Sequence, residues 1–186
     1  MGELYVALMH APVYNKNMEE VATSITNLDL HDIARSSATF GARAYYVVHP
    51  APAQKDLARR IMGFWREGYG AEYNPDRYEA FSRVRLLSTL QEVLGEIKIE
   101  QQGKKVYTVA TDARLYPNTI EYQDLRQRLE RTADVFLLLF GTGWGLIKEE
   151  MEKADYILKP IYGYGEYNHL SVRSAAAIIL DRLRGN

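Results

Sequence analysis

Segment 134–146, DVFLLLFGTGWGL, constrains this chain more than any other part of its sequence. Six apolar residues are followed at once by three glycines at alternate positions, a pattern typical of a buried strand that ends in a tight turn. A second strand-to-glycine passage follows at residues 156–170. Because the two passages lie close together in the chain, they predict a single ligand pocket to which both turns contribute.

Composition narrows the class of protein. The 186 residues are 47% hydrophobic, which suffices for one core, and we expect a single domain over residues 1–186. The 23 Lys and Arg nearly balance the 24 Asp and Glu, so any RNA binding must come from local patches. The absence of cysteine excludes disulfides, thiolate zinc sites and a cysteine nucleophile, and four scattered histidines argue against a metal site. We therefore expect chemistry that needs no metal or depends on a cofactor.

The sequence contains no membrane-spanning signal. No segment approaches the roughly 20 apolar residues that a membrane helix needs. The opening segment MGELYVALMHAP carries no basic leader before its apolar run. We therefore expect a cytoplasmic protein.

Short apolar runs alternate with longer helical patterns, which indicates an α/β fold with a parallel sheet covered by helices. The predicted strands are 4–9, 44–48, 106–110, 135–140 and 156–158. The predicted helices are 28–40, 54–65, 81–100, 122–131, 146–153 and 170–183. Asp29 is the expected N-cap of the first helix and Gly41 its C-terminal stop. Segment 63–78 is predicted to be a long surface loop or a short connecting helix.

The glycines at 141, 143 and 145 do not form a known phosphate loop. No Gly-Lys-Ser/Thr follows them, which excludes a Walker loop, and their spacing departs from the dinucleotide fingerprint GxGxxG. Two other interpretations stay open on the glycines alone. One is a tight strand-to-helix turn without a ligand, and the other is an unrelated α/β nucleotide-binding enzyme such as a reductase.

Segment 159–180, KPIYGYGEYNHLSVRSAAAIIL, has a proline after a strand, a glycine-rich loop and a Ser-containing start to an Ala-rich helix. In this order it resembles the third motif of the SPOUT superfamily of S-adenosylmethionine-dependent RNA methyltransferases. LLLFGTGWGL resembles the second motif, with Thr142 in place of the usual glutamate. DLHDIARSSATFGARAYYVV resembles the first motif and retains Arg35, Phe40 and Gly41.

The resemblance implies a parallel-sheet SPOUT fold with a C-terminal trefoil knot, whose glycine-rich loops bind S-adenosylmethionine largely through backbone groups. Glycine suits such a knot because crossing backbone segments leave little room for side chains. The resemblance further implies a homodimer formed through the knot region, in which the neighbouring chain supplies Arg35 to each site. The implied cofactor-binding residues are Thr111, Gly141, Gly143, Leu158, Ile161, Tyr162, His169, Leu170 and Ser171.

The implied reaction is a direct, metal-free methyl transfer to a ribose 2′-OH or a base nitrogen of tRNA or rRNA. Arg35 is the candidate for binding near the target ribose and phosphate, or else a surface arginine. His169 is a candidate general base or a simple hydrogen-bonding residue, and Arg173 is a candidate phosphate ligand or a solvated side chain. Because Thr142 and Ser171 replace the usual glutamate and asparagine, a non-catalytic S-adenosylmethionine-binding accessory module is the alternative.

Overall fold

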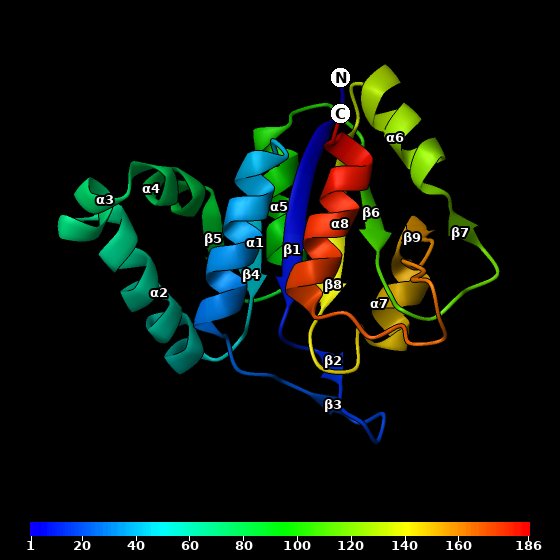
Figure 1. The fold of residues 1–186 in the computed structure, drawn as a ribbon, viewed down its shortest axis with the longest axis horizontal. Coiled ribbons are helices and arrows are strands. Elements are labelled where there is room, and N and C mark those ends of the chain that lie inside the picture. The colour runs from blue at the N-terminus through cyan, green and yellow to red at the C-terminus, as the bar shows by residue number, and fades with distance from the viewer.

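A seven-stranded sheet organises the chain in the computed structural model, which describes residues 1–186 (Figure 1). Its strands are β1 Glu3–Met9, β4 Tyr45–Val48, β5 Val84–Leu87, β6 Val106–Ala110, β7 Thr119–Ile120, β8 Val135–Gly141 and β9 Tyr156–Leu158. They lie in the order β5-β4-β1-β8-β6-β9-β7, and every neighbouring pair is parallel. A separate antiparallel hairpin is formed by β2 Val13–Tyr14 and β3 Glu20–Val21.

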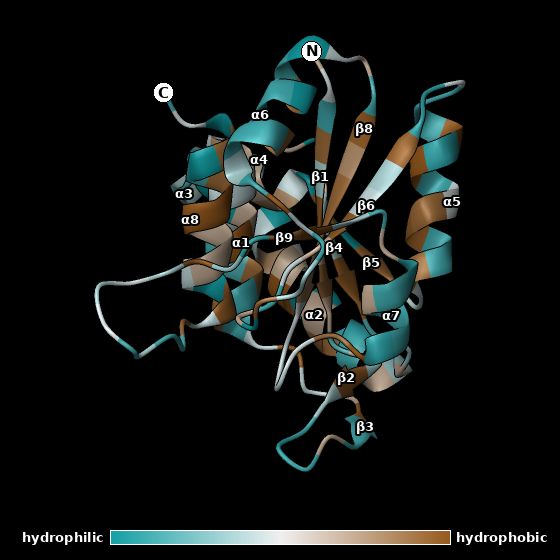
Figure 2. Ribbon diagram, turned by 90° about the vertical axis from the view of Figure 1, so that its right-hand side faces the viewer, coloured by the Kyte–Doolittle hydropathy of each residue, from teal (hydrophilic) through white to brown (hydrophobic).

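The two central strands, β1 and β8, pair along their whole length, from Glu3 opposite Val135 to Met9 opposite Gly141. Even-numbered residues of both strands enter one hydrophobic core and odd-numbered residues enter the other, as the alternation of side chains along a strand requires. Both faces are therefore covered, which explains why these strands are almost continuously apolar in sequence. Figure 2 shows the apolar strands between their helical layers.

Helices cover both faces of the sheet. The first core is closed by α1 Asn27–Thr39, α2 Pro52–Arg66, α4 Pro75–Ser82, α6 Tyr122–Arg131 and α8 Val172–Arg184. The second is closed by α5 Leu90–Glu100 and α7 Lys148–Lys153, while the short helix α3 Tyr69–Tyr73 lies between α2 and α4 in the chain. No helix is both long enough and apolar enough to cross a lipid bilayer.

The predicted helix 81–100 is wrong, because it contains an edge strand. The segment divides into the end of α4, strand β5 and helix α5, which starts after the N-cap Thr89. The strand sequence VRLL contains Arg and two Leu, which are good helix formers, so local propensity gives little sign of a strand. Pairing with β4 overrides that propensity.

Two further local predictions need correction. The N-cap of α1 is Thr26, whose hydroxyl oxygen accepts from the Asp29 backbone N–H at 3.1 Å and donates to Asp29 Oδ2 at 2.7 Å. Asp29 therefore lies in the first helical turn, whereas Gly41 takes the predicted left-handed conformation with φ of 68°. Segment 63–78 is mostly helical, with a break at Gly68 and a new helix start at Asn74.

Both chain ends lie at the amino edge of the sheet, at the top of Figure 1. The loops that follow β1, β6, β8 and β9 gather at the opposite, carboxyl edge. In parallel α/β sheets this edge is where ligands bind. The fold therefore places the two glycine-rich passages at the same edge of the sheet.

Candidate active site

A cavity of about 700 Å³ lies at the carboxyl edge and is lined by the loops after β6, β8 and β9 and by the start of α8. Its volume is within the usual range of small-molecule sites, about 300–1,000 Å³. Tyr162 is 53% exposed and does not line the cavity. Every other predicted cofactor residue does: Thr111, Gly141, Gly143, Leu158, Ile161, His169, Leu170 and Ser171.

The glycine turn after β8 is sterically fixed. A Cβ atom on Gly141 would lie 2.5 Å from the backbone nitrogen of Leu146, and one on Gly143 would lie 2.7 Å from the carbonyl oxygen of Tyr14. Gly143 and Gly145 also have positive φ angles of 59° and 99°. The close-packing role expected of these glycines is therefore confirmed at Gly141 and Gly143.

The loop after β6 forms the opposite part of the wall. Thr111 donates from its hydroxyl to the carbonyl oxygen of Leu139 at 2.9 Å, which ties this loop to β8. Beside it, Arg114 pairs with Asp112 through two hydrogen bonds, Nη2 to Oδ2 at 2.7 Å and Nε to Oδ1 at 3.0 Å. The Asp112 side chain is only 5% exposed, so this pair is a fixed part of the wall.

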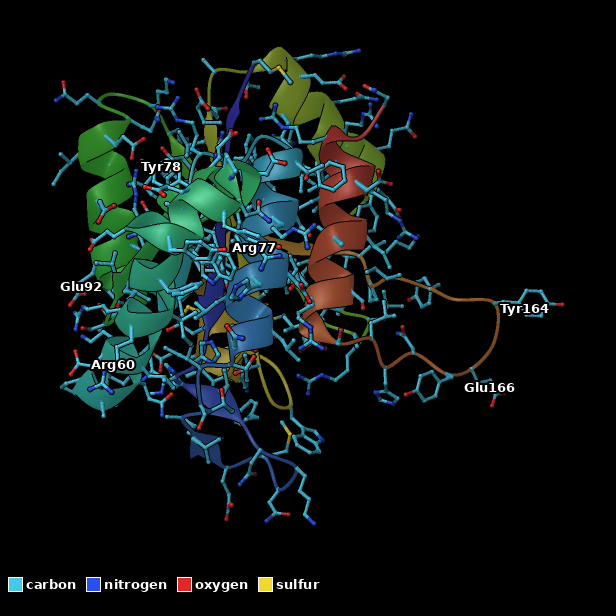
Figure 3. The ribbon with its side chains drawn as sticks, turned by 60° about the vertical axis from the view of Figure 1, so that its left-hand side comes forward. Arg60, Arg77, Tyr78, Glu92, Tyr164 and Glu166 are labelled. Carbon is cyan, nitrogen blue, oxygen red and sulfur yellow. The ribbon has the colours of Figure 1, made fainter.

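The second glycine-rich loop connects β9 to α8. Asn168 donates from Nδ2 to the carbonyl oxygen of Ala113 at 3.0 Å, which holds the end of this loop against the loop after β6. Ser171 caps α8 by accepting from the Ser174 backbone N–H at 3.2 Å. The middle of the loop projects away from the body of the protein, as the labelled Tyr164 in Figure 3 shows.

Arg173 links α8 to α1. Its Nη1 lies 3.0 Å from Asp29 Oδ1, and its Nε lies 3.4 Å from Asp32 Oδ2. Asp29 and Arg173 both line the cavity. Arg173 is thus engaged by two carboxylates rather than freely solvated, a pairing that the sequence did not predict.

The structure separates the other two catalytic candidates. His169 is exposed on the cavity rim and lies edge-on to Tyr167, with ring centroids 5.5 Å apart. Arg35 is exposed on α1 and does not line the cavity of its own chain. It lies six residues beyond Asp29, which is about 9 Å along the helix axis.

A partly buried chain of hydrogen-bonded side chains behind the glycine turn was not predicted from the sequence. His10 Nδ1 lies 3.2 Å from Thr23 Oγ1, which lies 2.5 Å from Thr142 Oγ1. The Thr142 hydroxyl donates in turn to the carbonyl oxygen of Met9 at 3.1 Å. Thr142, which replaces the family glutamate, is therefore used to attach the turn to β1. The only sequence signal was the position of His10 directly after a strand.

His10 should make the stability of the protein depend on pH. The side chain is fully buried, and burial lowers its pKa from 6.5 to about 4, against the opposing effect of nearby Asp29. Between these two pKa values the unfolded chain binds more protons than the folded protein. The stability that the neutral, buried His10 contributes is therefore complete above pH 6.5 and is lost as the pH falls. We expect His10 to account for about 2–3 kcal/mol of stability lost between pH 7 and pH 4.5.

Urea unfolding of the wild type and of His10→Asn at both pH values measures this contribution. The asparagine amide can keep a hydrogen bond to Thr23 but does not titrate, so the variant should lose less stability on acidification. An equal loss in both proteins would contradict the prediction.

The comparisons with known proteins identify the family. The model of a family described as SAM-dependent RNA methyltransferase matches residues 3–185. The chain belongs to this family. Its cofactor is therefore S-adenosylmethionine, as the sequence predicted.

Relatives and solved structures agree with this assignment. An uncharacterized protein of Aquifex aeolicus is 44% identical over 180 residues, which cover 97% of this chain and 87% of that protein. A tRNA (guanine-N(1)-)-methyltransferase of Oleidesulfovibrio alaskensis is 44% identical over 183 residues, 98% of this chain but 42% of that protein, so the chain spans less than half of that relative. The SpoU methyltransferase AviRb of Streptomyces viridochromogenes, solved in complex with AdoMet, gives a TM-score of 0.59 at 18% identity over 98% of this chain and 56% of that chain. The predicted α/β SPOUT fold class is confirmed.

The cavity fits the cofactor chemically. S-adenosylmethionine combines a flat adenine, apolar on its faces and polar at its edge, with ribose hydroxyls and an amino-acid group that carries both charges. The cavity wall contains the apolar residues Leu158, Ile161 and Ile179. It also contains two ion pairs, Asp112–Arg114 and Asp29–Arg173. Tyr122 also lines the cavity, and its hydroxyl is buried without a hydrogen-bond partner, a group that a ligand could satisfy.

Proposed function

We propose that this methyltransferase methylates tRNA by direct transfer that needs no metal. The observation that carries the proposal is the single cavity lined by four separate segments, 111–114, 140–145, 158–161 and 168–173. The name of the Oleidesulfovibrio alaskensis relative supports tRNA as the substrate. A tRNA substrate in turn supports a cytoplasmic location.

We further propose that residues 1–186 act as one domain that forms a C-terminal knot and a homodimer. Apolar side chains around the cavity mouth support a dimer, because Met18 is 49% exposed, Trp144 is 59% exposed and Leu170 is 47% exposed. Large exposed apolar side chains that cluster at one place commonly mark an interface. A second chain on this face would bring its own α1, and with it Arg35, toward the cavity.

Different residues of the chain would have different roles in the reaction. The bound cofactor supplies a methyl group on a positively charged sulfur. The glycine turn and Leu158, Ile161 and Leu170 would hold its adenine, while Arg35 of the second chain would orient the target ribose and phosphate. His169, on the rim, would accept the proton that the attacking group loses. Arg173 would act as a positioning residue, because it fixes Asp29 at the wall.

Calorimetry with S-adenosylhomocysteine, followed by transfer of labelled methyl groups to total tRNA, tests the proposal. We expect binding, and incorporation into tRNA but not into DNA oligonucleotides. Binding without transfer to any RNA would contradict a catalytic role and favour an accessory module. Comparison of modified nucleosides in tRNA and rRNA from cells with and without the gene, by mass spectrometry, would identify the target.

A further inference from the structure

A second cavity, of about 510 Å³, adjoins the first, and Met18 and Arg114 line both. It lies between the β2–β3 hairpin, the loop between β6 and β7, and helix α7. Figure 2 shows α7 beside the hairpin. Its volume, too, falls in the usual range for small-molecule sites, about 300–1,000 Å³. None of the residues predicted to bind the cofactor lines this second cavity.

Two tyrosines give the second cavity an aromatic lining. Tyr14 accepts at its hydroxyl from the Lys148 backbone N–H at 3.2 Å, and the Tyr116 hydroxyl donates to Asp112 Oδ2 at 3.4 Å. Both side chains are half-buried, and each is attached at its outer end. Apolar Leu146 lies deeper in the wall. Fixed aromatic rings beside an apolar wall suit a flat ring system that can stack.

Polar groups in the same wall favour an occupant that can form hydrogen bonds. The Asn118 carboxamide forms no hydrogen bond within the chain, and Glu152 is paired only with Lys148, at 3.5 Å between Nζ and Oε1. Both side chains are exposed at the cavity and can form hydrogen bonds with a polar occupant, which a hydrocarbon cannot do. A nucleobase presents both donors and acceptors on its edge, together with a stacking face.

Arg114 connects the two cavities. Its bidentate pair with Asp112 fixes the guanidinium, and its Nη2 lies 3.8 Å from the place where a Cβ of Gly145 would be. The arginine therefore stands beside the glycine turn, at the boundary of both cavities. A guanidinium in a fixed position is well suited to bind a phosphate oxygen.

We propose that the second cavity binds one nucleotide of the RNA substrate, with its base beside Tyr14 and Tyr116 and its phosphate toward Arg114. The inference rests on the proposed function, because it places the RNA next to the cofactor cavity. A bound nucleotide there would share Arg114 and Met18 with the cofactor site. Occupation of one cavity would then be compatible with occupation of the other.

Titration of the protein with AMP, GMP, CMP and UMP, monitored by NMR in the presence of saturating S-adenosylhomocysteine, tests the proposal. We expect at least one nucleotide to bind while S-adenosylhomocysteine stays bound. Tyr116→Ala should lower the affinity for that nucleotide by about tenfold, because loss of base stacking on an aromatic ring commonly costs this much. The affinity for S-adenosylhomocysteine should not change. Tyr116→Phe, which keeps the ring, should bind nearly as well as the wild type.

Asn118→Ala provides a second variant that cannot disturb the core, because this side chain is exposed. It should reduce the preference among the four nucleotides. Displacement of the nucleotide by S-adenosylhomocysteine, absence of nucleotide binding, or equal affinity in Tyr116→Ala and the wild type would each overturn the inference. Failure of the proposed function would look different, because S-adenosylhomocysteine would not bind, or would bind without methyl transfer to any RNA.

Discussion

Gly141→Ala is expected to weaken S-adenosylhomocysteine binding by at least about thirtyfold, equivalent to about 2 kcal/mol. The added Cβ would lie 2.5 Å from the Leu146 nitrogen and 2.7 Å from the Gly145 carbonyl carbon. Both atoms belong to the backbone, so no side-chain rotation relieves the contact. The turn that forms one cavity wall must move, and calorimetry measures the resulting loss of affinity.

Gly165→Ala in the second glycine-rich loop is the matched control. No heavy atom lies within 4 Å of the added Cβ, and the residue does not have a positive φ angle. We expect an affinity within about twofold of the wild type, because an alanine in an open loop adds no strain. If Gly141→Ala binds as tightly as this control, the glycine turn does not form the cofactor wall.

The two glycine-rich passages also show what sequence patterns can predict. Both were expected to serve close approach of backbone segments, and within this chain Gly163 and Gly165 do not. An added Cβ at Gly163 would make only an ordinary contact, 3.8 Å from the carbonyl oxygen of Tyr167, and one at Gly165 would have no heavy atom within 4 Å. A glycine in a sequence permits a tight turn but does not reveal whether another segment lies against it. At Gly143 that segment is the hairpin residue Tyr14, which is distant in the chain.

The sequence predicted the core strands and a single pocket at the glycine-rich passages because both depend on simple patterns. Apolar runs locate β1 and β8, and the carboxyl ends of parallel strands meet at one edge, which places Thr111, Gly141 and Leu158 together. Strand β5 lacked such a pattern because it lies at the sheet edge and contains Arg85, which pairs with Glu96 and Glu100 of α5 instead of entering a core.

Contacts between side chains that are distant in sequence could not be predicted in the same way. The Arg173–Asp29 pair joins residues 144 positions apart, and the Thr23–Thr142 contact joins residues 119 apart. Each residue alone is a common helix or loop residue. Their partners are set by the packing of α1 on α8 and of the β1–α1 connection on the glycine turn.

Arg35→Ala is expected to reduce methyl transfer to tRNA by at least about a hundredfold, while the affinity for S-adenosylhomocysteine changes by less than about twofold. Arg35 is exposed and lines no part of the cavity in its own chain, so its loss should not disturb the cofactor. Single-turnover transfer and calorimetry separate the two effects. Arg35→Lys, which keeps the charge without the planar fork, should recover only part of the activity. Parallel loss of cofactor binding would show instead that Arg35 supports the fold.

Mixed dimers decide whether Arg35 acts on the partner's site. Arg35→Ala chains keep the cofactor cavity, and Gly141→Ala chains keep Arg35. With S-adenosylmethionine held well below the weakened Kd of the Gly141→Ala chain, each homodimer should have little activity. If the arginine is supplied by the partner, random mixing should restore about a quarter of the wild-type activity, because half of the dimers would contain one complete site. If Arg35 serves its own chain, neither subunit has both Arg35 and an intact cofactor cavity, and mixing should restore no activity. The tagged and purified mixed dimer then gives the activity of one complete site directly. As a control, a Gly165→Ala chain paired with a Gly141→Ala chain should retain full activity at its own cofactor cavity, because both chains keep Arg35.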